Sequence, residues 1–125
     1  IATLQVPVCF VHIGWPDLSL GVDHAGIKGL CRLLETGKVW VKLSGLYRLS
    51  NAPYEQTDEI VAALVNANPE RCLWGSDWPH VMLNGAEMPK SGQMLDALCR
   101  VVTDRDTQKR ILIENPKELY GFADT

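Results

Sequence analysis

The amino-acid sequence predicts an α/β fold built on parallel strands. Three short apolar runs have the composition of strands that are covered on both faces, and each is followed by a segment with apolar residues at helical spacing. A strand–helix unit that repeats three times requires parallel strands joined by right-handed crossovers. The chain has 125 residues, 46% of them hydrophobic, and this length allows one domain at most.

The predicted strands and helices alternate along the chain. Residues 6–11 (VPVCFV) form the first apolar run, residues 39–43 (VWVKL) the second, and residues 73–74 (LW) the third and shortest. After each run, apolar residues recur every three or four positions, as on the buried face of a helix. They are Ile27, Leu30, Cys31 and Leu34; Ile60, Val61, Leu64 and Val65; and Met94, Leu95, Leu98 and Val102.

A further short helix is expected near the end of the sequence, in NPKELYGF. Asn115 has the side chain of an N-cap residue, Pro116 suits the first helical position, and Glu118 can complete a capping box. Gly121 is expected to end the helix.

A parallel sheet of only three strands would leave two edges unpaired. We therefore expect residues 1–125 to form a single partial domain. Its remaining strands would come from a missing N-terminal part of the same protein or from self-association. The absence of an initiator Met agrees with this expectation.

Composition argues against several classes of protein. The formal net charge is −3 and no basic tract is present, so a nucleic-acid partner is not expected. No apolar run approaches the roughly 20 residues of a membrane span, and no secretory signal is recognisable. The four cysteines, which form no CxxC pair, are expected to be reduced and apolar in a cytoplasmic protein. They are Cys9, Cys31, Cys72 and Cys99.

Three side chains suited to chemistry follow three different predicted strands. His12 comes after the first strand, Arg48 lies in the segment after the second, and Asp77 comes after the third. In parallel α/β barrels the functional groups lie at this end of the strands. Asp77 is the best candidate, because an acid directly after a buried strand is costly without a task or a partner; a turn-capping role is the alternative. His12 taken alone is more often a core or loop histidine, and Arg48 is as easily a solvated loop residue.

Three further residues have two possible roles each. His80 could reach the same cavity as Asp77, but solvent exposure is slightly favoured. His24 is expected to be structural, beside Asp23 as the N-cap of the following helix. Lys42 alternates with apolar neighbours and should point away from the helices, either as an ion-pair partner or as a substrate contact.

The segments WVKLSGLYRLS, RCLWGSDWPH and NPKELYGF resemble the 2-pyrone-4,6-dicarboxylate hydrolase branch of the amidohydrolase superfamily, and HIGWPDLSLGVDHAG fits the same branch. The resemblance covers nearly the whole chain and implies the C-terminal part of a (β/α)8 barrel, about strands six to eight. Two features depart from the family. Val11 replaces the aspartate that commonly precedes the late-strand histidine, and the first-strand His-x-His pair is absent.

The resemblance implies hydrolysis of a carboxylated lactone. Asp77 would be the general base, His12 would orient water or stabilise the oxyanion, and Arg48 would hold a substrate carboxylate. Tyr47 and His80 are further candidates for substrate binding. Whether a metal takes part is open: His12 and Asp77 would be ligands of a zinc ion in the complete barrel. The alternatives are a metal-dependent lactonase or decarboxylase on the same barrel, and a non-catalytic fragment that is stable only through association.

Overall fold

The structure, a computed structural model, describes residues 4–81, 83, 85 and 87–123. Its centre is a parallel sheet of three strands in the order β1 (Val8–Phe10), β2 (Val39–Leu43) and β3 (Cys72–Trp74). Val8 is paired with Val39, and Val41 with Cys72. The predicted α/β fold with parallel strands is confirmed. Within the described residues, no strand pairs with the outer edge of β1 or of β3.

The first strand is shorter than the apolar run that predicted it. Val6 is 67% exposed and lies outside the ladder. At the other end, His12 has a φ of 53°, a left-handed conformation that no strand can continue through. The apolar composition of residues 6–11 therefore overestimates the strand by three residues.

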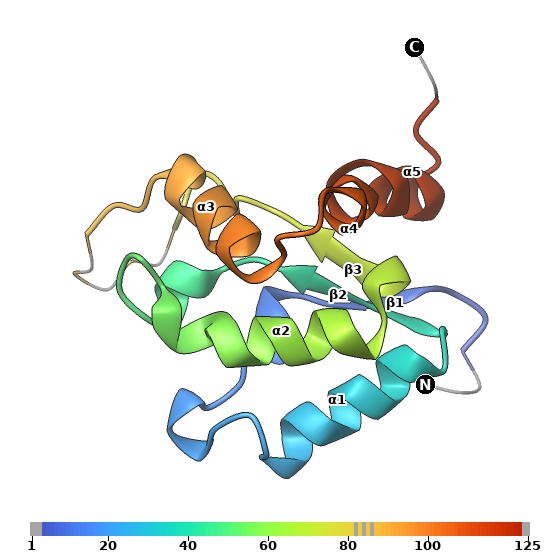
Figure 1. Ribbon diagram of the computed structural model, residues 1–125, viewed down its shortest axis with the longest axis horizontal. Coiled ribbons are helices and arrows are strands. Elements are labelled where there is room, and N and C mark those ends of the chain that lie inside the picture. The colour runs from blue at the N-terminus through green and yellow to red at the C-terminus, as the bar shows by residue number, and fades with distance from the viewer. Residues whose placement is uncertain (1–3, 82, 84, 86, 124–125) are drawn as a thin grey trace.

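Each strand is followed by at least one helix (Figure 1). The two helices α1 and α2 pack against each other, and α1 also contacts β2. The last three helical segments run on from one another, and the π-helical turn and α5 contact β3. The helices are α1 (Ala25–Glu35), α2 (Asp58–Ala67), α3 (Ser91–Val101), α4 (Arg105–Lys109), a π-helical turn (Arg110–Glu114) and α5 (Asn115–Tyr120). No helix in the described part of the chain is long and apolar enough to cross a membrane.

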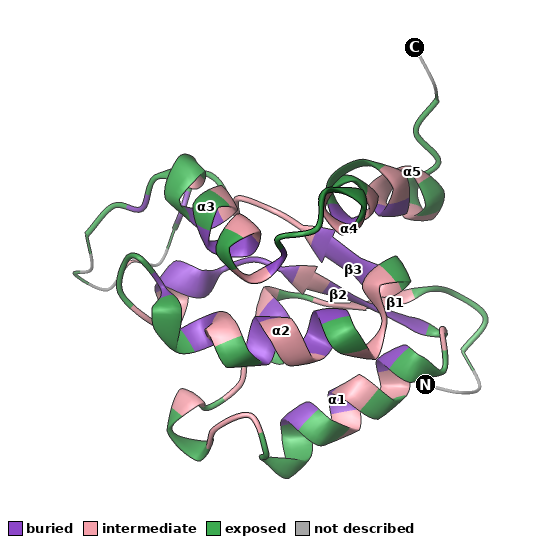
Figure 2. Cartoon of the chain, viewed as in Figure 1, coloured by how far each residue is buried: buried purple, intermediate pink, exposed green. Residues whose placement is uncertain are grey.

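The hydrophobic core lies between the sheet and the helices, where Figure 2 shows buried residues on β2, β3 and α2. Val39 and Val41 of β2 are fully buried in this core, together with Leu64 of α2. Because side chains alternate along a strand, Lys42 points to the opposite face, as predicted. On that face the side chain of Lys42 packs beside Gly75, where an added Cβ would lie 3.3 Å from Lys42 Cδ.

Two predicted helix caps are wrong. Asn115 does not begin a helix: the helix starts at Arg105, with Asp104 as the N-cap, and Asn115 lies within the continuous helical segment that follows. The cause is tertiary, because the fully buried Asn115 amide donates to the carbonyl oxygens of Pro69 (2.7 Å) and Cys72 (2.8 Å). The predicted end at Gly121 is confirmed, since this residue caps α5 with a φ of 71°.

Helix α1 is capped by His24 and not by Asp23. The His24 ring accepts a hydrogen bond from the Gly26 backbone through Nδ1 (3.2 Å). This bond satisfies one of the backbone N–H groups that every helix start leaves without a partner. The expectation that His24 is structural therefore agrees with its position.

Candidate active site

The candidate site lies where the three strands end. His12 follows β1 by two residues, Tyr47 and Arg48 belong to a single 3₁₀ turn after β2 (Leu46–Arg48), and Asp77 follows β3 by three residues. His12 (φ 53°) and Asp77 (φ 58°) both have left-handed backbone conformations. Such conformations are uncommon for residues other than glycine and often occur at functional sites.

The Asp77 carboxylate is the centre of the site. Its Oδ2 accepts a hydrogen bond from the Tyr47 hydroxyl (2.6 Å), and Arg48 Nη2 lies 3.1 Å from the same oxygen. His12 Nε2 lies 3.9 Å from the same oxygen. The prediction that His12, Arg48 and Asp77 converge is therefore confirmed. Their catalytic and binding roles remain predictions.

Tyr47 and Arg48 hold the carboxylate as a connected pair. Arg48 Nε donates to the Tyr47 hydroxyl oxygen (3.1 Å), while that hydroxyl donates to Asp77. Burial raises the pKa of Tyr47, and the hydrogen bond to Asp77 raises it further, so the phenol keeps its proton. The hydrogen bond to Tyr47 raises the pKa of Arg48. The carboxylate thus faces a permanent cation and a neutral O–H donor.

Sequence reasoning missed Trp15. Its ring lies edge-on to His12, with ring centres 5.3 Å apart, and the Arg48 guanidinium lies 5.7 Å from its centre. Trp15 is still 53% exposed. An aromatic side chain placed between a histidine and an arginine restricts both through edge and cation–π contacts. The position of Trp15, three residues after His12, was the sequence feature that could have indicated this contact.

Ser44 was missed as well. This residue is 2% exposed, and its Oγ lies 3.0 Å from His12 Nδ1. Burial lowers the pKa of His12; Asp77 opposes this effect, and Arg48 and Lys42 add to it. The net effect favours the neutral form of the His12 ring.

His80 does not face solvent, contrary to expectation. The residue is 4% exposed, its Nε2 lies 3.0 Å from the Ser76 carbonyl oxygen, and its ring lies edge-on to Tyr47 at 5.4 Å. Through these contacts, His80 connects Ser76, the residue before Asp77, to Tyr47, whose hydroxyl donates to the Asp77 carboxylate. The assignment of His80 to substrate binding stays a prediction.

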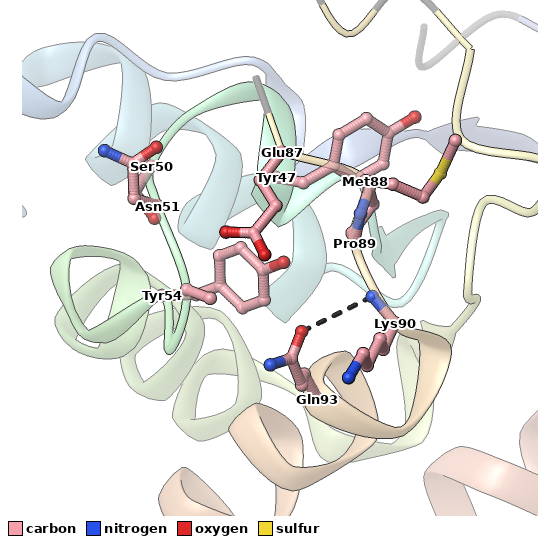
Figure 3. Close-up of a pocket in the computed structure, with 10 residues that line it drawn as sticks. Tyr47, Ser50, Asn51, Tyr54, Glu87, Met88, Pro89, Lys90 and Gln93 are labelled. Carbon is pink, nitrogen blue, oxygen red and sulfur yellow. Dashed lines mark hydrogen bonds between the residues drawn. The ribbon is translucent and has the colours of Figure 1, made fainter.

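Tyr47 also lines a small pocket, whose wall is shown in Figure 3. Its volume is about 170 Å³, and Tyr54, Glu87 and Lys90 contribute to its wall. Tyr54 is 2% exposed; burial raises its pKa, and the Glu87 carboxylate adds to the effect. Tyr47 is thus shared between the Asp77 cluster and a polar cavity.

The chain offers two ligands to a metal ion. Zinc binds nitrogen and oxygen ligands at about 2.0–2.2 Å, and the 3.9 Å between His12 Nε2 and Asp77 Oδ2 allows both to share one ion. Over the residues that the structure describes, no group of three His, Cys, Asp or Glu side chains gathers at one place. The two side chains therefore fit part of a zinc site, whose further ligands would lie outside this set.

Comparisons with known proteins identify the family of the chain. The family model Amidohydro_2 (Amidohydrolase) matches residues 2–122. A 4-sulfomuconolactone hydrolase from Rhizobium radiobacter is 35% identical over 97% of this chain and 42% of its own length. A 2-pyrone-4,6-dicarboxylate hydrolase from Comamonas testosteroni is 32% identical over 94% of this chain and 42% of its own length.

Solved structures of related hydrolases share the fold of this chain. The crystal structure of a probable 2-pyrone-4,6-dicarboxylic acid hydrolase from Acinetobacter baumannii with citric acid bound is 27% identical, with a TM-score of 0.81 over 97% of this chain and 46% of that one. The chain therefore spans less than half the length of these relatives, and its strand–helix units form part of a (β/α)8 barrel. Because the family model matches residues 2–122, nearly the whole chain, the chain belongs to the amidohydrolase family.

Proposed function

We propose that the protein hydrolyses a lactone that carries acidic groups, with Asp77 as the general base. The observation that supports this proposal most directly is the Asp77 carboxylate, held through one oxygen by Tyr47 (2.6 Å) and Arg48 (3.1 Å). The names of both relatives describe hydrolases of lactones with acidic substituents. The cations Arg48 and Lys42 and the Asp77 carboxylate all act electrostatically on His12, and this excess of positive charge favours an anionic substrate.

The arrangement of donors leaves one carboxylate oxygen for the chemistry. All three contacts to Asp77 involve Oδ2, and within the described residues none donates to Oδ1. Oδ1 would take a proton from water while the water oxygen attacks the lactone carbonyl. The ring C–O bond then breaks, and the same proton passes to the leaving oxygen. Positioned proton transfer of this kind contributes about 10²- to 10⁴-fold to the rate.

His12 and Arg48 would act on the charges that the reaction involves. A neutral His12 can donate one hydrogen bond to the oxyanion that develops at the attacked carbonyl, a contribution of about 3 kcal/mol. Arg48 would bind a carboxylate or sulfonate of the substrate and so orient the ring. If zinc is bound, His12 and Asp77 would hold it, and it would supply a more acidic bound water.

The main test is Asp77→Asn, assayed by the absorbance change on ring opening of 2-pyrone-4,6-dicarboxylate and of 4-sulfomuconolactone. We expect kcat to fall by at least about 10²-fold, because the amide cannot accept the proton. The matched control is Asp23→Asn, whose side chain is 91% exposed and lies 4.0 Å from Lys28 Nζ. It should change kcat less than about twofold. Retained activity in Asp77→Asn would remove this residue from the role of base.

Two alternatives make different predictions for the same assays. A metal-dependent lactonase or decarboxylase would lose activity on chelation and regain it with zinc. A non-catalytic fragment that depends on association is favoured by the unpaired outer edges of β1 and β3 within the described residues. That alternative predicts an inactive, folded oligomer by size-exclusion chromatography, whereas an active enzyme contradicts it.

A further inference from the structure

The His12 ring is held from one side by the end of strand β2. Ser44 Oγ accepts a hydrogen bond from the His12 backbone N–H (3.3 Å) and also lies 3.0 Å from His12 Nδ1. One buried hydroxyl therefore contacts both the backbone and the ring of the same residue. The opposite ring nitrogen, Nε2, is the one that faces Asp77 at 3.9 Å.

Gly45, the residue after Ser44, leaves room for the His12 ring because it has no side chain. A Cβ at position 45 would overlap His12 Nδ1 and would lie 2.6 Å from His12 Cγ, closer than real Cβ contacts allow. Gly45 also has a φ of 66°, in the left-handed region that glycine adopts without strain. Ser44 thus provides a hydrogen-bonding hydroxyl, and the missing side chain of Gly45 leaves the space that the His12 imidazole occupies.

The hydrogen bonds of Ser44 determine which ring nitrogen carries the proton. A serine hydroxyl has one proton to donate and can accept from two donors. Ser44 already accepts from the His12 backbone, and among the described residues its only other hydrogen-bond partner is His12 Nδ1. If Nδ1 carried the proton, the buried hydroxyl proton would be left without an acceptor, which is costly. The arrangement that satisfies every group has the Ser44 hydroxyl donating to Nδ1.

We propose that Ser44 is a positioning residue that holds the His12 ring in the tautomer with its proton on Nε2, directed towards Asp77 and the substrate. With no metal ion on Nε2, His12 then acts at the site as a hydrogen-bond donor and not as a base. The effect of this tautomer on catalysis rests on the proposed function, but the tautomer itself does not.

The direct test is nuclear magnetic resonance on the ¹⁵N-labelled protein, using long-range ¹H–¹⁵N correlations at about pH 8, where histidines of ordinary pKa are neutral. We expect His12 in the wild type to show a protonated Nε2 and an unprotonated Nδ1. Ser44→Ala should convert this single form into a mixture of both tautomers. Ser44→Thr, which keeps a hydroxyl, should restore the Nε2–H form.

His24 provides an internal control in the same spectra. Its Nδ1 accepts from the Gly26 N–H, so its tautomer does not depend on Ser44 and should be unchanged in every variant. A protonated Nδ1 on His12 in the wild type would overturn the proposal, as would an unchanged His12 pattern in Ser44→Ala. Because the wild-type spectrum decides by itself, a variant that failed to fold would not leave the proposal untested.

Kinetics separate this proposal from the proposed function. If the lactone is a substrate, Ser44→Ala should lower kcat by about 10- to 100-fold, as is typical when the partner that orients a histidine is removed. KM should change less than about twofold, because Ser44 is buried. An inactive wild type with the predicted His12 tautomer would refute the proposed function and leave the role of Ser44 intact.

Discussion

Replacing Asn115 by aspartate distinguishes two roles for this residue: the helix N-cap that the sequence predicts and the buried hydrogen-bond donor that the structure shows. As an N-cap, asparagine is exchanged for aspartate at little cost, and the helix dipole favours the negative charge. In the structure the amide of Asn115 is instead a buried donor to two carbonyl oxygens, those of Pro69 and Cys72. Asn115→Asp replaces that donor with an acceptor that faces two acceptors. The two interpretations predict effects of opposite sign.

The size of the effect follows from the two lost hydrogen bonds. A buried acceptor that loses its partner costs about 1–3 kcal/mol, so two such carbonyl groups predict about 2–6 kcal/mol. Burial of an unpaired carboxylate adds to this cost. Both effects raise the pKa of the introduced carboxyl above its unfolded value of about 3.9. The variant is therefore least destabilised below about pH 4, and loses stability as the pH rises through the raised folded pKa.

Urea unfolding, followed by tryptophan fluorescence at pH 7 and pH 4, measures this loss. With a slope of about 2 kcal/mol per M, a loss of about 4 kcal/mol lowers the midpoint by about 2 M. Asn51→Asp is the matched control at an exposed position, and should shift the free energy of unfolding by less than about 0.5 kcal/mol. An unchanged or raised midpoint in Asn115→Asp would refute the tertiary role of this amide.

Two other predictions concern the site and the core. Arg48→Met should raise KM for an acidic lactone by about tenfold or more, since a hydrogen bond to a charged group contributes about 1.5–3 kcal/mol. An equal increase for an uncharged lactone would contradict binding of the acidic group by Arg48. Cys72 is fully buried, and burial raises its pKa to about 12, so its thiol should not react with Ellman's reagent at pH 8 in the folded protein. Wild type and Cys72→Ser should then show the same number of fast-reacting thiols, and one thiol fewer in the variant would contradict this burial.

Elements with strong local patterns could be predicted closely from the sequence. The run VWVKL forms strand β2 over residues 39–43, as predicted, because apolar and β-branched residues there pair on both sides and pack on the helices. The buried faces of α1 and α2 were also predicted, since helical spacing places apolar residues on one side. The first strand was overestimated because apolar composition contains no information about the left-handed backbone at His12.

The order of strands and helices and the meeting of His12, Arg48 and Asp77 at one end of the sheet were determined by the sequence alone. Both follow from local periodicity and from the rule that parallel strands end on the same side. Only the tertiary structure decided which atoms meet: the Tyr47 hydroxyl on Asp77, and Ser44 against His12. These partners are 30 and 32 residues apart along the chain. Their contacts depend on the twist of the strands and the course of the loops. The residues next to each partner in the sequence contain no information about either.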